Sequence, residues 1–241
     1  MHGIFIADAH LRNEADDNYQ KLLSFLATIQ GKIDTLYILG DLFEFWIGYR
    51  RTAFPHYLPV LEQLHNLVKH GTRIVYFEGN HDFHMGRYFT ETLRAEVHPG
   101  PATIDIDGKR VFLCHGDRIN QKDYGYRLLR ATLHSRFSKM LIPIVPVALT
   151  SFIADRLSRQ SSERRGSHGL VCDQSSIIRH FADDKFAQGY DVVICGHFHI
   201  PFLERTDSNN GRILLSLGDW INQYSYGEWL DGKLYIKVFG E

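Results

Sequence analysis

Five short polar motifs could carry chemistry in this chain, and each follows a short apolar run. They read Asp8-Ala9-His10, Gly40-Asp41, Gly79-Asn80-His81-Asp82, Cys114-His115-Gly116-Asp117 and Gly196-His197-Phe198-His199. The side chains that could bind a metal are Asp8, His10, Asp41, Asn80, His115, His197 and His199. Carboxylate, imidazole and amide ligands without thiolate favour divalent ions such as Mn²⁺, Fe²⁺ or Zn²⁺.

The number of candidate ligands indicates two ions, because seven side chains exceed what one tetrahedral zinc ion needs. In Asp8-Ala9-His10 and His197-Phe198-His199, the two polar side chains share one side of an extended segment, since strand periodicity is two. Two ions about 3.5–4 Å apart can clamp a phosphoryl oxygen and stabilise an in-line displacement. The pattern therefore predicts a two-metal site that hydrolyses phosphate esters, with a carboxylate shared between the ions.

The five motifs together resemble those of the calcineurin-like metallophosphoesterases, in the same order and from Ile6 to His199. That family carries D-x-H, G-D, G-N-H-D/E, a later His and G-H-x-H. The resemblance implies that Asp41 bridges the two ions. It implies one ion on Asp8, His10, Asp41 and His199, and another on Asp41, Asn80, His115 and His197.

His81 is the candidate for proton transfer. The resemblance implies that His81 lies beside the metals and, with Asn80, contacts the phosphate, or protonates the leaving group. A histidine titrates near neutrality, as a general acid must. Asp82 is expected to orient the His81 ring through a hydrogen bond. A single histidine is more often simply packed or solvated, but the joint pattern of five motifs favours the catalytic interpretation.

The elements that must position these residues alternate between strands and helices in the first part of the chain. The apolar runs before the motifs are expected to be strands, and residues 18–30 and 57–70 carry helical apolar stripes. Asp107-Gly108 and Asp231-Gly232 are expected hairpin turns, and the chain after His199 looks rich in strands. This pattern fits an α/β protein, a four-layer α/β/β/α sandwich, and the family resemblance implies the same architecture.

Composition limits the function classes. A chain of 241 residues allows one α/β domain with a small insertion. A formal net charge of -1 gives no general attraction to nucleic acid. Three cysteines without C-x-x-C spacing suggest reduced thiols in the cytoplasm. A strand close to Met1 argues against a signal peptide, and no apolar run reaches the roughly 18 residues of a spanning helix.

Residues 120–170 form an expected helical insertion between two parts of the metallophosphoesterase core, 1–119 and 171–241. The insertion contains nine Lys or Arg residues against three Asp or Glu residues. In one interpretation its apolar stripe packs on the core and its charges are solvated. In the other it is a lid over the metals, whose basic residues, Arg127 and Arg130 among them, bind phosphate while its apolar face binds lipid.

A closer resemblance is to the UDP-2,3-diacylglucosamine hydrolases of lipid A biosynthesis. It rests on residues 39–48, residues 6–11, His115-Gly116-Asp117 and the spacing to Tyr126. It implies Mn²⁺-dependent attack of water on the α-phosphorus of UDP-2,3-diacylglucosamine, giving UMP and 2,3-diacylglucosamine 1-phosphate (lipid X). It also implies a cytoplasmic enzyme peripheral to the inner membrane, a lid that holds the acyl chains, and a substrate contact at Tyr126.

One position departs from that closer pattern. The best-known members carry G-N-R-D, with the arginine on the substrate phosphate, whereas this chain has His81, as a second branch does. The alternative function is therefore hydrolysis of soluble nucleotides or other phosphate mono- and diesters. A third hypothesis is a non-enzymatic scaffold that binds a partner through the insertion. Such scaffolds usually lose metal ligands, and this chain keeps all seven.

Overall fold

The computed structural model describes residues 1–48, 54–120, 132, 135, 174–206 and 211–240. The predicted lid, residues 120–170, lies almost entirely outside the described residues, and so do Tyr126, Arg127 and Arg130. The predicted division into core and lid therefore stays a prediction.

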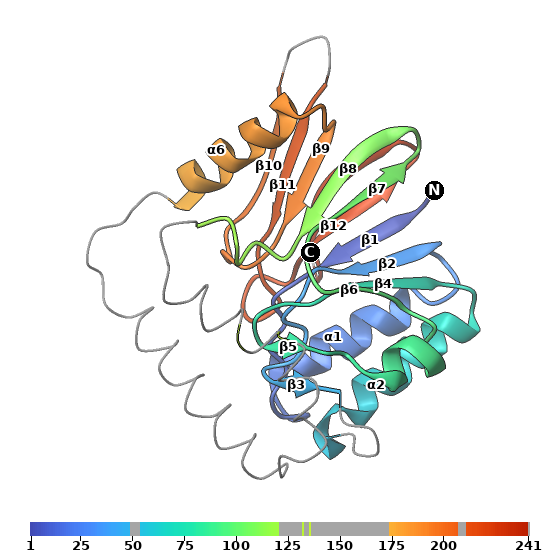
Figure 1. Cartoon of the computed structure of the whole chain (residues 1–241). Coiled ribbons are helices and arrows are strands. Elements are labelled where there is room, and N and C mark those ends of the chain that lie inside the picture. Colours follow the sequence, from blue (N-terminus) through green and yellow to red (C-terminus); the bar gives the residue numbers. More distant parts are fainter. Residues whose placement is uncertain (49–53, 121–131, 133–134, 136–173, 207–210, 241) are drawn as a thin grey trace.

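Two sheets form the centre of the described structure (Figure 1). The six-stranded sheet has the order β13-β12-β1-β2-β4-β6, and the five-stranded sheet has the order β10-β11-β9-β8-β7. The first contains β1 (Gly3–Ile6), β2 (Thr35–Ile38), β4 (Arg73–Phe77), β6 (Glu96–His98), β12 (Ser225–Leu230) and β13 (Lys233–Val238). The second contains β7 (Ala102–Ile106), β8 (Lys109–Cys114), β9 (Val192–Cys195), β10 (Pro201–Arg205) and β11 (Ile213–Leu217).

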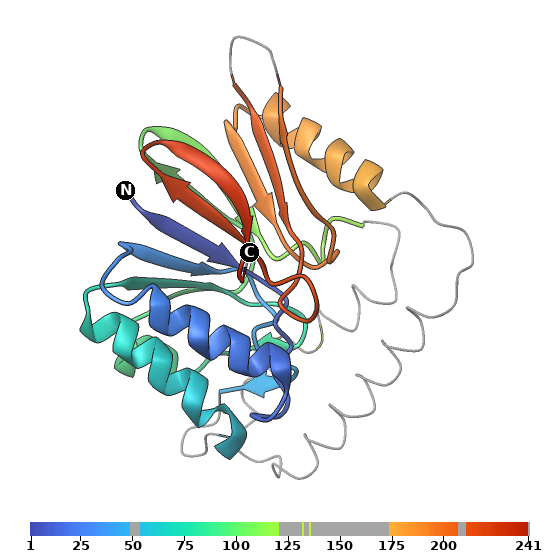
Figure 2. The same ribbon diagram turned by 180° about the vertical axis from the view of Figure 1, so that it is seen from behind.

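Helices cover the outer faces of both sheets, as Figures 1 and 2 show from opposite sides. Helices α1 (Asp17–Thr28) and α2 (Leu58–Lys69) lie on the six-stranded sheet, and α6 (Gln174–Ala187) lies on the five-stranded sheet. Short elements complete the described structure: η1 (Pro55–Tyr57), η2 (Tyr88–Thr92), and a two-stranded sheet of β3 (Trp46–Ile47) and β5 (Asp82–Phe83). The result is the predicted four-layer sandwich.

Three buried apolar clusters fill the spaces between the four layers, and strand alternation explains them. In β1, Ile4 and Ile6 pack toward α1 and α2, whereas Phe5 packs toward the second sheet. In β9, Ile194 faces the first sheet and Val193 faces α6. Both faces of these central strands are thus buried, which is why their sequences read as continuous apolar runs.

The helices predicted at residues 18–30 and 57–70 and the two predicted turns are confirmed to within a few residues. Helix α1 is followed by Gly31 at φ 68°, and α2 is followed by Gly71 at φ 92°. Both predicted hairpins have positive φ at the two turn residues: 51° and 75° at Asp107 and Gly108, and 52° and 74° at Asp231 and Gly232. This is the geometry that a two-residue hairpin matching the strand twist requires.

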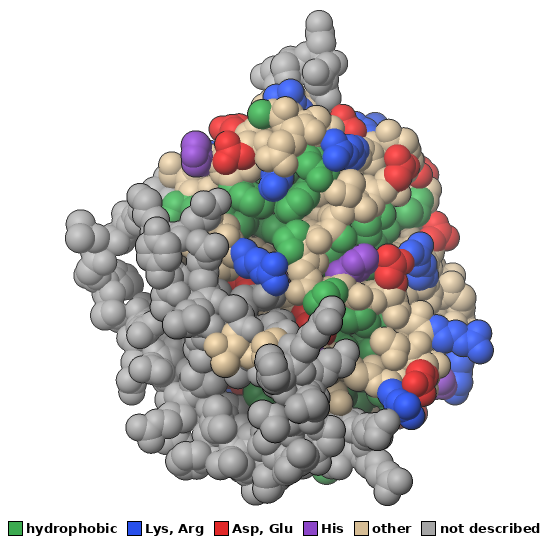
Figure 3. All heavy atoms as spheres, in the orientation of Figure 1, with side chains coloured by type: hydrophobic (Ala, Val, Ile, Leu, Met, Phe, Trp, Pro, Cys, Tyr) green, Lys and Arg blue, Asp and Glu red, His purple; other side chains and the backbone are tan. Residues whose placement is uncertain are grey.

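The surface of the described part carries charges of both signs. On the face in Figure 3, Lys and Arg side chains intermingle with Asp and Glu side chains, in keeping with the formal net charge of -1. Of the helices that the structure describes, none has the length and apolar character needed to cross a bilayer.

Candidate metal centre

The candidate ligands lie at one edge of the sandwich because their strands run in the same direction. β1, β2 and β4 are parallel neighbours, and so are β8 and β9. Each of the five polar motifs begins within a few residues of a strand's carboxyl end, the place where open α/β sheets bind ligands. A pocket of about 590 Å³ opens there, and its lining includes His10, Asp41, Asn80, His197 and His199.

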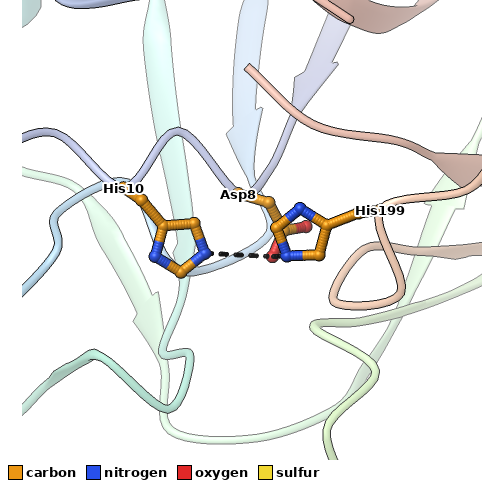
Figure 4. Close-up of side chains that lie close together, drawn as sticks. All are labelled: Asp8, His10 and His199. Carbon is orange, nitrogen blue, oxygen red and sulfur yellow. Dashed lines mark ion pairs between the residues drawn. The ribbon is translucent and has the colours of Figure 1, made fainter. Parts of the chain in front are cut away.

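One group of donors consists of Asp8, His10 and His199, whose candidate ligand atoms lie within 4.8 Å of one another. The Oδ1 atom of Asp8 lies 3.9 Å from Nε2 of His10 and 3.8 Å from Nε2 of His199. Figure 4 shows the His10 and His199 rings close together, with the Asp8 carboxylate next to the His199 ring. We call this group position A.

A second group consists of Asp41, His115 and His197, with Asn80 beside it. Nε2 of His115 lies 3.0 Å from Oδ1 of Asn80, 3.3 Å from Oδ2 of Asp41 and 3.2 Å from Nδ1 of His197. We call this group position B. The structure therefore brings all seven predicted ligands together, in two adjoining groups.

Asp41 lies between the two positions. Its Oδ2 is 3.7 Å from Nε2 of His10 in position A and 3.3 Å from Nε2 of His115 in position B. Position A takes His199 from the five-stranded sheet, and position B takes His115 and His197 from it. The remaining donors follow strands of the six-stranded sheet, so both positions draw on both sheets.

Each acidic ligand has one oxygen fixed by a backbone N–H from another motif. Oδ2 of Asp8 accepts from the His197 N–H at 2.7 Å, and Oδ1 of Asp41 accepts from the His81 N–H at 2.9 Å. The other oxygen of each carboxylate is directed at the neighbouring imidazoles. The carboxylates are thus oriented before any ion binds.

Buried polar atoms without partners fit the presence of a metal. Oδ1 of Asp8 and Nε2 of His10 are buried and have no hydrogen-bond partner. An unpaired buried polar group costs about 1–3 kcal/mol. Both atoms face the shared space of position A, where a cation would satisfy them. The donor set is carboxylate and imidazole, which suits a divalent ion of borderline or hard character.

Burial and neighbouring charges shift the pKa values of several candidate ligands. Burial disfavours a charged ring at His115, but the carboxylates of Asp41 and Asp8 outweigh it and raise the His115 pKa to about 10. Burial acts to raise the pKa of Asp41, yet charges on His115, His81 and His10 lower it well below its ordinary value. Burial and the charge on His115 lower the pKa of His197 to about 3. The carboxylates of Asp41 and Asp8 therefore favour positive charge beside them, which a divalent cation can supply.

The backbone that carries the ligands is in the left-handed region at five of them, where non-glycine residues are uncommon. The φ values are 57° at Asp8, 45° at His10, 53° at Asp41, 72° at His197 and 55° at His199. Such conformations cost roughly 1–3 kcal/mol each and cluster at functional sites. Bonds between motifs hold them in place, including Asp8 N–H to the Gly40 carbonyl at 3.1 Å and His10 N–H to the Asp41 carbonyl at 2.9 Å.

Glycines in the motifs allow this close approach. A Cβ on Gly79 would lie 2.1 Å from Oδ1 of Asp41, and one on Gly196 would lie 2.6 Å from Oδ2 of Asp8. A Cβ on Gly40 would lie 2.7 Å from Nδ1 of His115. These three glycines are therefore needed for space, and Gly40, at φ 84°, is needed for the turn as well.

The predicted role of Asp82 is wrong in one respect, since its carboxylate holds the backbone rather than the His81 ring. It accepts from the N–H groups of Asp41 at 3.0 Å, Leu42 at 2.7 Å and Gly79 at 3.0 Å, and from the Tyr76 hydroxyl at 2.5 Å. Burial and the nearby Asp41 carboxylate raise the Asp82 pKa to about 7. Asp82 thus fixes the loop that presents Asp41.

The His81 ring is oriented by Glu44 instead. Nδ1 of His81 donates to the Glu44 carbonyl oxygen at 2.9 Å, which leaves Nε2 as its second functional atom. The ring stands edge-on to His10, with 4.7 Å between centroids. His81 therefore lies next to position A, and its ring has a different partner from the expected one.

Two carboxylates beside the ligands were not predicted. Oδ2 of Asp219 lies 3.2 Å from Nδ1 of His199, and Oε2 of Glu44 lies 3.4 Å from Nδ1 of His10. Asp219 had a readable signal, because Gly218-Asp219 follows an apolar strand as Gly40-Asp41 does. Glu44 had no comparable signal in the sequence.

Comparisons with known proteins place these motifs in a family. Residues 1–201 match the family described as calcineurin-like phosphoesterase. A Vibrio cholerae protein named UDP-2,3-diacylglucosamine hydrolase is 29% identical over 231 residues, which are 93% of this chain and 93% of that protein. Proteins of the same name from Ectopseudomonas mendocina and Ralstonia nicotianae are 32% and 30% identical, over 91% and 95% of this chain and 90% of each of theirs.

Proposed function

This chain belongs to the calcineurin-like phosphoesterase family and is a metal-dependent hydrolase, and we propose that its substrate is UDP-2,3-diacylglucosamine. It cleaves the pyrophosphate bond and releases UMP and 2,3-diacylglucosamine 1-phosphate (lipid X), a step of lipid A biosynthesis. The observation that carries this proposal is similarity over more than nine-tenths of the chain to proteins of that name in several bacteria. The convergence of seven suitable donors at one edge of the sandwich supports it.

The metal ligands follow from the two groups. Position A would hold one divalent ion and position B another, and Asp41 would belong to both ligand sets. We assign Mn²⁺ to both positions, with Fe²⁺ or Zn²⁺ as alternatives. The ligands are Asp8, His10, Asp41 and His199 in position A, and Asp41, Asn80, His115 and His197 in position B.

The chemistry is an in-line displacement at phosphorus. When bound, two such ions supply Lewis acidity at a phosphoryl oxygen and a nucleophile from water at neutral pH. Asp8 and Asp41, each tied through one oxygen to a backbone N–H, keep the other oxygen pointed into the centre. Asn80 and His81 contact the phosphate. The Nε2 atom of His81 delivers a proton to the leaving group, while the Glu44 carbonyl holds Nδ1.

The lipid part of the substrate calls for an apolar surface beside the metals. We assign this role to residues 120–170 as a lid, with Tyr126, Arg127 and Arg130 binding the substrate. The enzyme works in the cytoplasm, and peripheral contact with the cytoplasmic face of the inner membrane gives it access to its lipid-linked substrate.

The test is hydrolysis of UDP-2,3-diacylglucosamine by the Mn²⁺-loaded protein, beside a deacylated UDP-sugar. Cleavage of the acylated substrate alone supports the proposal and gives the lid its acyl-binding role. Equal cleavage of both would favour soluble nucleotides, the alternative that His81 suggests. Failure to cleave either, while a simple phosphodiester is hydrolysed, would remove the lipid assignment and keep the phosphoesterase.

A further inference from the structure

Both histidines of position A have a carboxylate on the ring nitrogen that faces away from the centre. Nε2 of His10 and Nε2 of His199 point at Asp8, as Figure 4 shows. The Nδ1 atom of His199 meets Oδ2 of Asp219 at 3.2 Å, and the Nδ1 atom of His10 lies 3.4 Å from Oε2 of Glu44. In proteins that bind metals, such a carboxylate fixes the tautomer and ring orientation and raises the basicity of the ligating nitrogen.

We propose that Glu44 and Asp219 are positioning residues for the ion in position A, acting through His10 and His199. The inference rests on the proposed dimetal function and deepens it, because it assigns these two carboxylates to one of the two ions. Both are well buried, with side chains 13% and 7% exposed. In position B the corresponding partner of His115 is neutral, since Nδ1 of His115 donates to the Leu39 carbonyl at 2.8 Å.

The buried Nδ1 of His10 gives a second, independent reason for the role of Glu44. This atom is buried and has no hydrogen-bond partner, and the Glu44 carboxylate is within ion-pair distance of it. A ring that binds an ion through Nε2 must carry its proton on Nδ1, where an acceptor is then needed. Glu44 supplies that acceptor.

The second oxygen of each carboxylate accepts hydrogen bonds from other groups. An amide substitution can therefore change only the atom that faces the histidine ring. Oε1 of Glu44 accepts from Nη2 of Arg12 at 2.8 Å. In Glu44→Gln the amide oxygen keeps the bond to Arg12, so the NH₂ group faces Nδ1 of His10. A donor then meets a donor, and the ring is driven to the tautomer that carries its proton on Nε2.

The same argument applies to Asp219. Its Oδ1 accepts from the N–H groups of Ile221 and Asn222 at 2.9 Å and of Gln223 at 3.2 Å. In Asp219→Asn the amide oxygen stays with these three donors, so the turn is kept while the NH₂ group faces His199. Both variants therefore place a donor where the carboxylate oxygen faced the ring nitrogen, without removing the packing.

The chain offers a matched control. Glu96 also has one oxygen near an arginine, Arg73, and the other 2.9 Å from a histidine, Nε2 of His98, but it belongs to neither metal position. Glu96→Gln makes the same chemical change away from the centre. This control measures the effect that a Glu-to-Gln substitution outside the centre has on metal binding and melting temperature.

The experiment is direct titration of the metal-free proteins with Mn²⁺ alone, followed by metal content after dialysis and electron paramagnetic resonance. In Glu44→Gln and Asp219→Asn, we expect the affinity for one of the two Mn²⁺ ions to fall by about 10–100-fold. The affinity for the other ion should stay unchanged. The spectrum should then change from a coupled pair to an isolated ion. The double variant should still lose only one ion, because both residues act on position A.

Two results would overturn the proposal. In the first, Glu44→Gln and Asp219→Asn bind two ions as tightly as the control Glu96→Gln does. In the second, they lose both ions in parallel. Melting temperatures of the metal-free proteins separate positioning from folding. If metal-free Asp219→Asn melts lower than the wild type, Glu44→Gln carries the test by itself. This experiment uses no substrate. If the protein fails to cleave UDP-2,3-diacylglucosamine, the positioning role of Glu44 and Asp219 is therefore unaffected. If the two variants bind metal as the wild type does, that positioning role is refuted, whatever the substrate is.

Discussion

Gly79→Ala is the sharpest test of how the centre is assembled. Gly79 is not at positive φ, so alanine brings no backbone strain of its own. Its new Cβ would lie 2.1 Å from Oδ1 of Asp41 and 2.6 Å from the Asp41 backbone nitrogen. Real Cβ contacts essentially never come closer than 3.0 Å. Asp41 cannot yield as a flexible side chain would, because Asp82 holds its N–H at 3.0 Å and the His81 N–H holds its Oδ1 at 2.9 Å.

The magnitude follows from the displacement. Relieving the contact moves the Asp41 carboxylate by about 1 Å, and a misplacement of that size costs about 100-fold in rate. This corresponds to about 2.7 kcal/mol in the activation free energy. The extra methyl group in this well-packed site should also lower the free energy of unfolding by about 1–3 kcal/mol.

The assay measures kcat/KM for the Mn²⁺-loaded protein, together with its melting temperature. Gly100→Ala is the matched control, because Gly100 also lacks positive φ and its new Cβ would meet only the end of the Arg118 side chain, at 3.3 Å. We expect Gly100→Ala to behave as the wild type. If Gly79→Ala keeps kcat/KM within about threefold of Gly100→Ala, the idea that Asp41 is held in a fixed place is refuted.

Four other outcomes are expected. Asp41→Ala removes the shared ligand and should abolish turnover; substantial residual activity would contradict a two-ion centre. His81→Ala should lower kcat while the metal content stays at the wild-type value, and loss of metal would make His81 a ligand. Tyr76→Phe removes a buried hydrogen bond to the Asp82 carboxylate and should lower the free energy of unfolding by about 1.5–3 kcal/mol in a denaturant titration. Chelation of the ions should lower the melting temperature, and Mn²⁺ should restore it; an unchanged melting temperature would mean that the centre binds metal weakly.

Much of the fold, and the convergence of the candidate ligands, could be predicted because both depend on local patterns. The apolar run at Ile4–Ile6 is continuous since β1 is buried on both faces, and the polar motif begins within two residues of its end. Parallel strands then bring such motifs to a common edge, so that Asp8 and His197 meet although 189 residues separate them. Order along the chain was enough to predict this convergence.

Hydrogen bonds between loops could not be predicted in the same way. Asp82 is adjacent to His81 in sequence and lies in β5, which pairs with β3, yet its carboxylate accepts from the Leu42 N–H. The left-handed backbone at His10 and Asp41 depends on bonds between two motifs. Such features arise from tertiary contacts, which residue types and spacing do not specify.

The use of both sheets by each metal position has a mechanical consequence. Apolar contacts join the two layers along their length, and these contacts are non-directional. A bound ion would add a directional, reversible cross-link between the layers at the end where the described candidate ligands gather. Loss of the ions would remove this cross-link, while the hydrogen bond from the His197 N–H to Asp8 and the apolar contacts would still join the two layers.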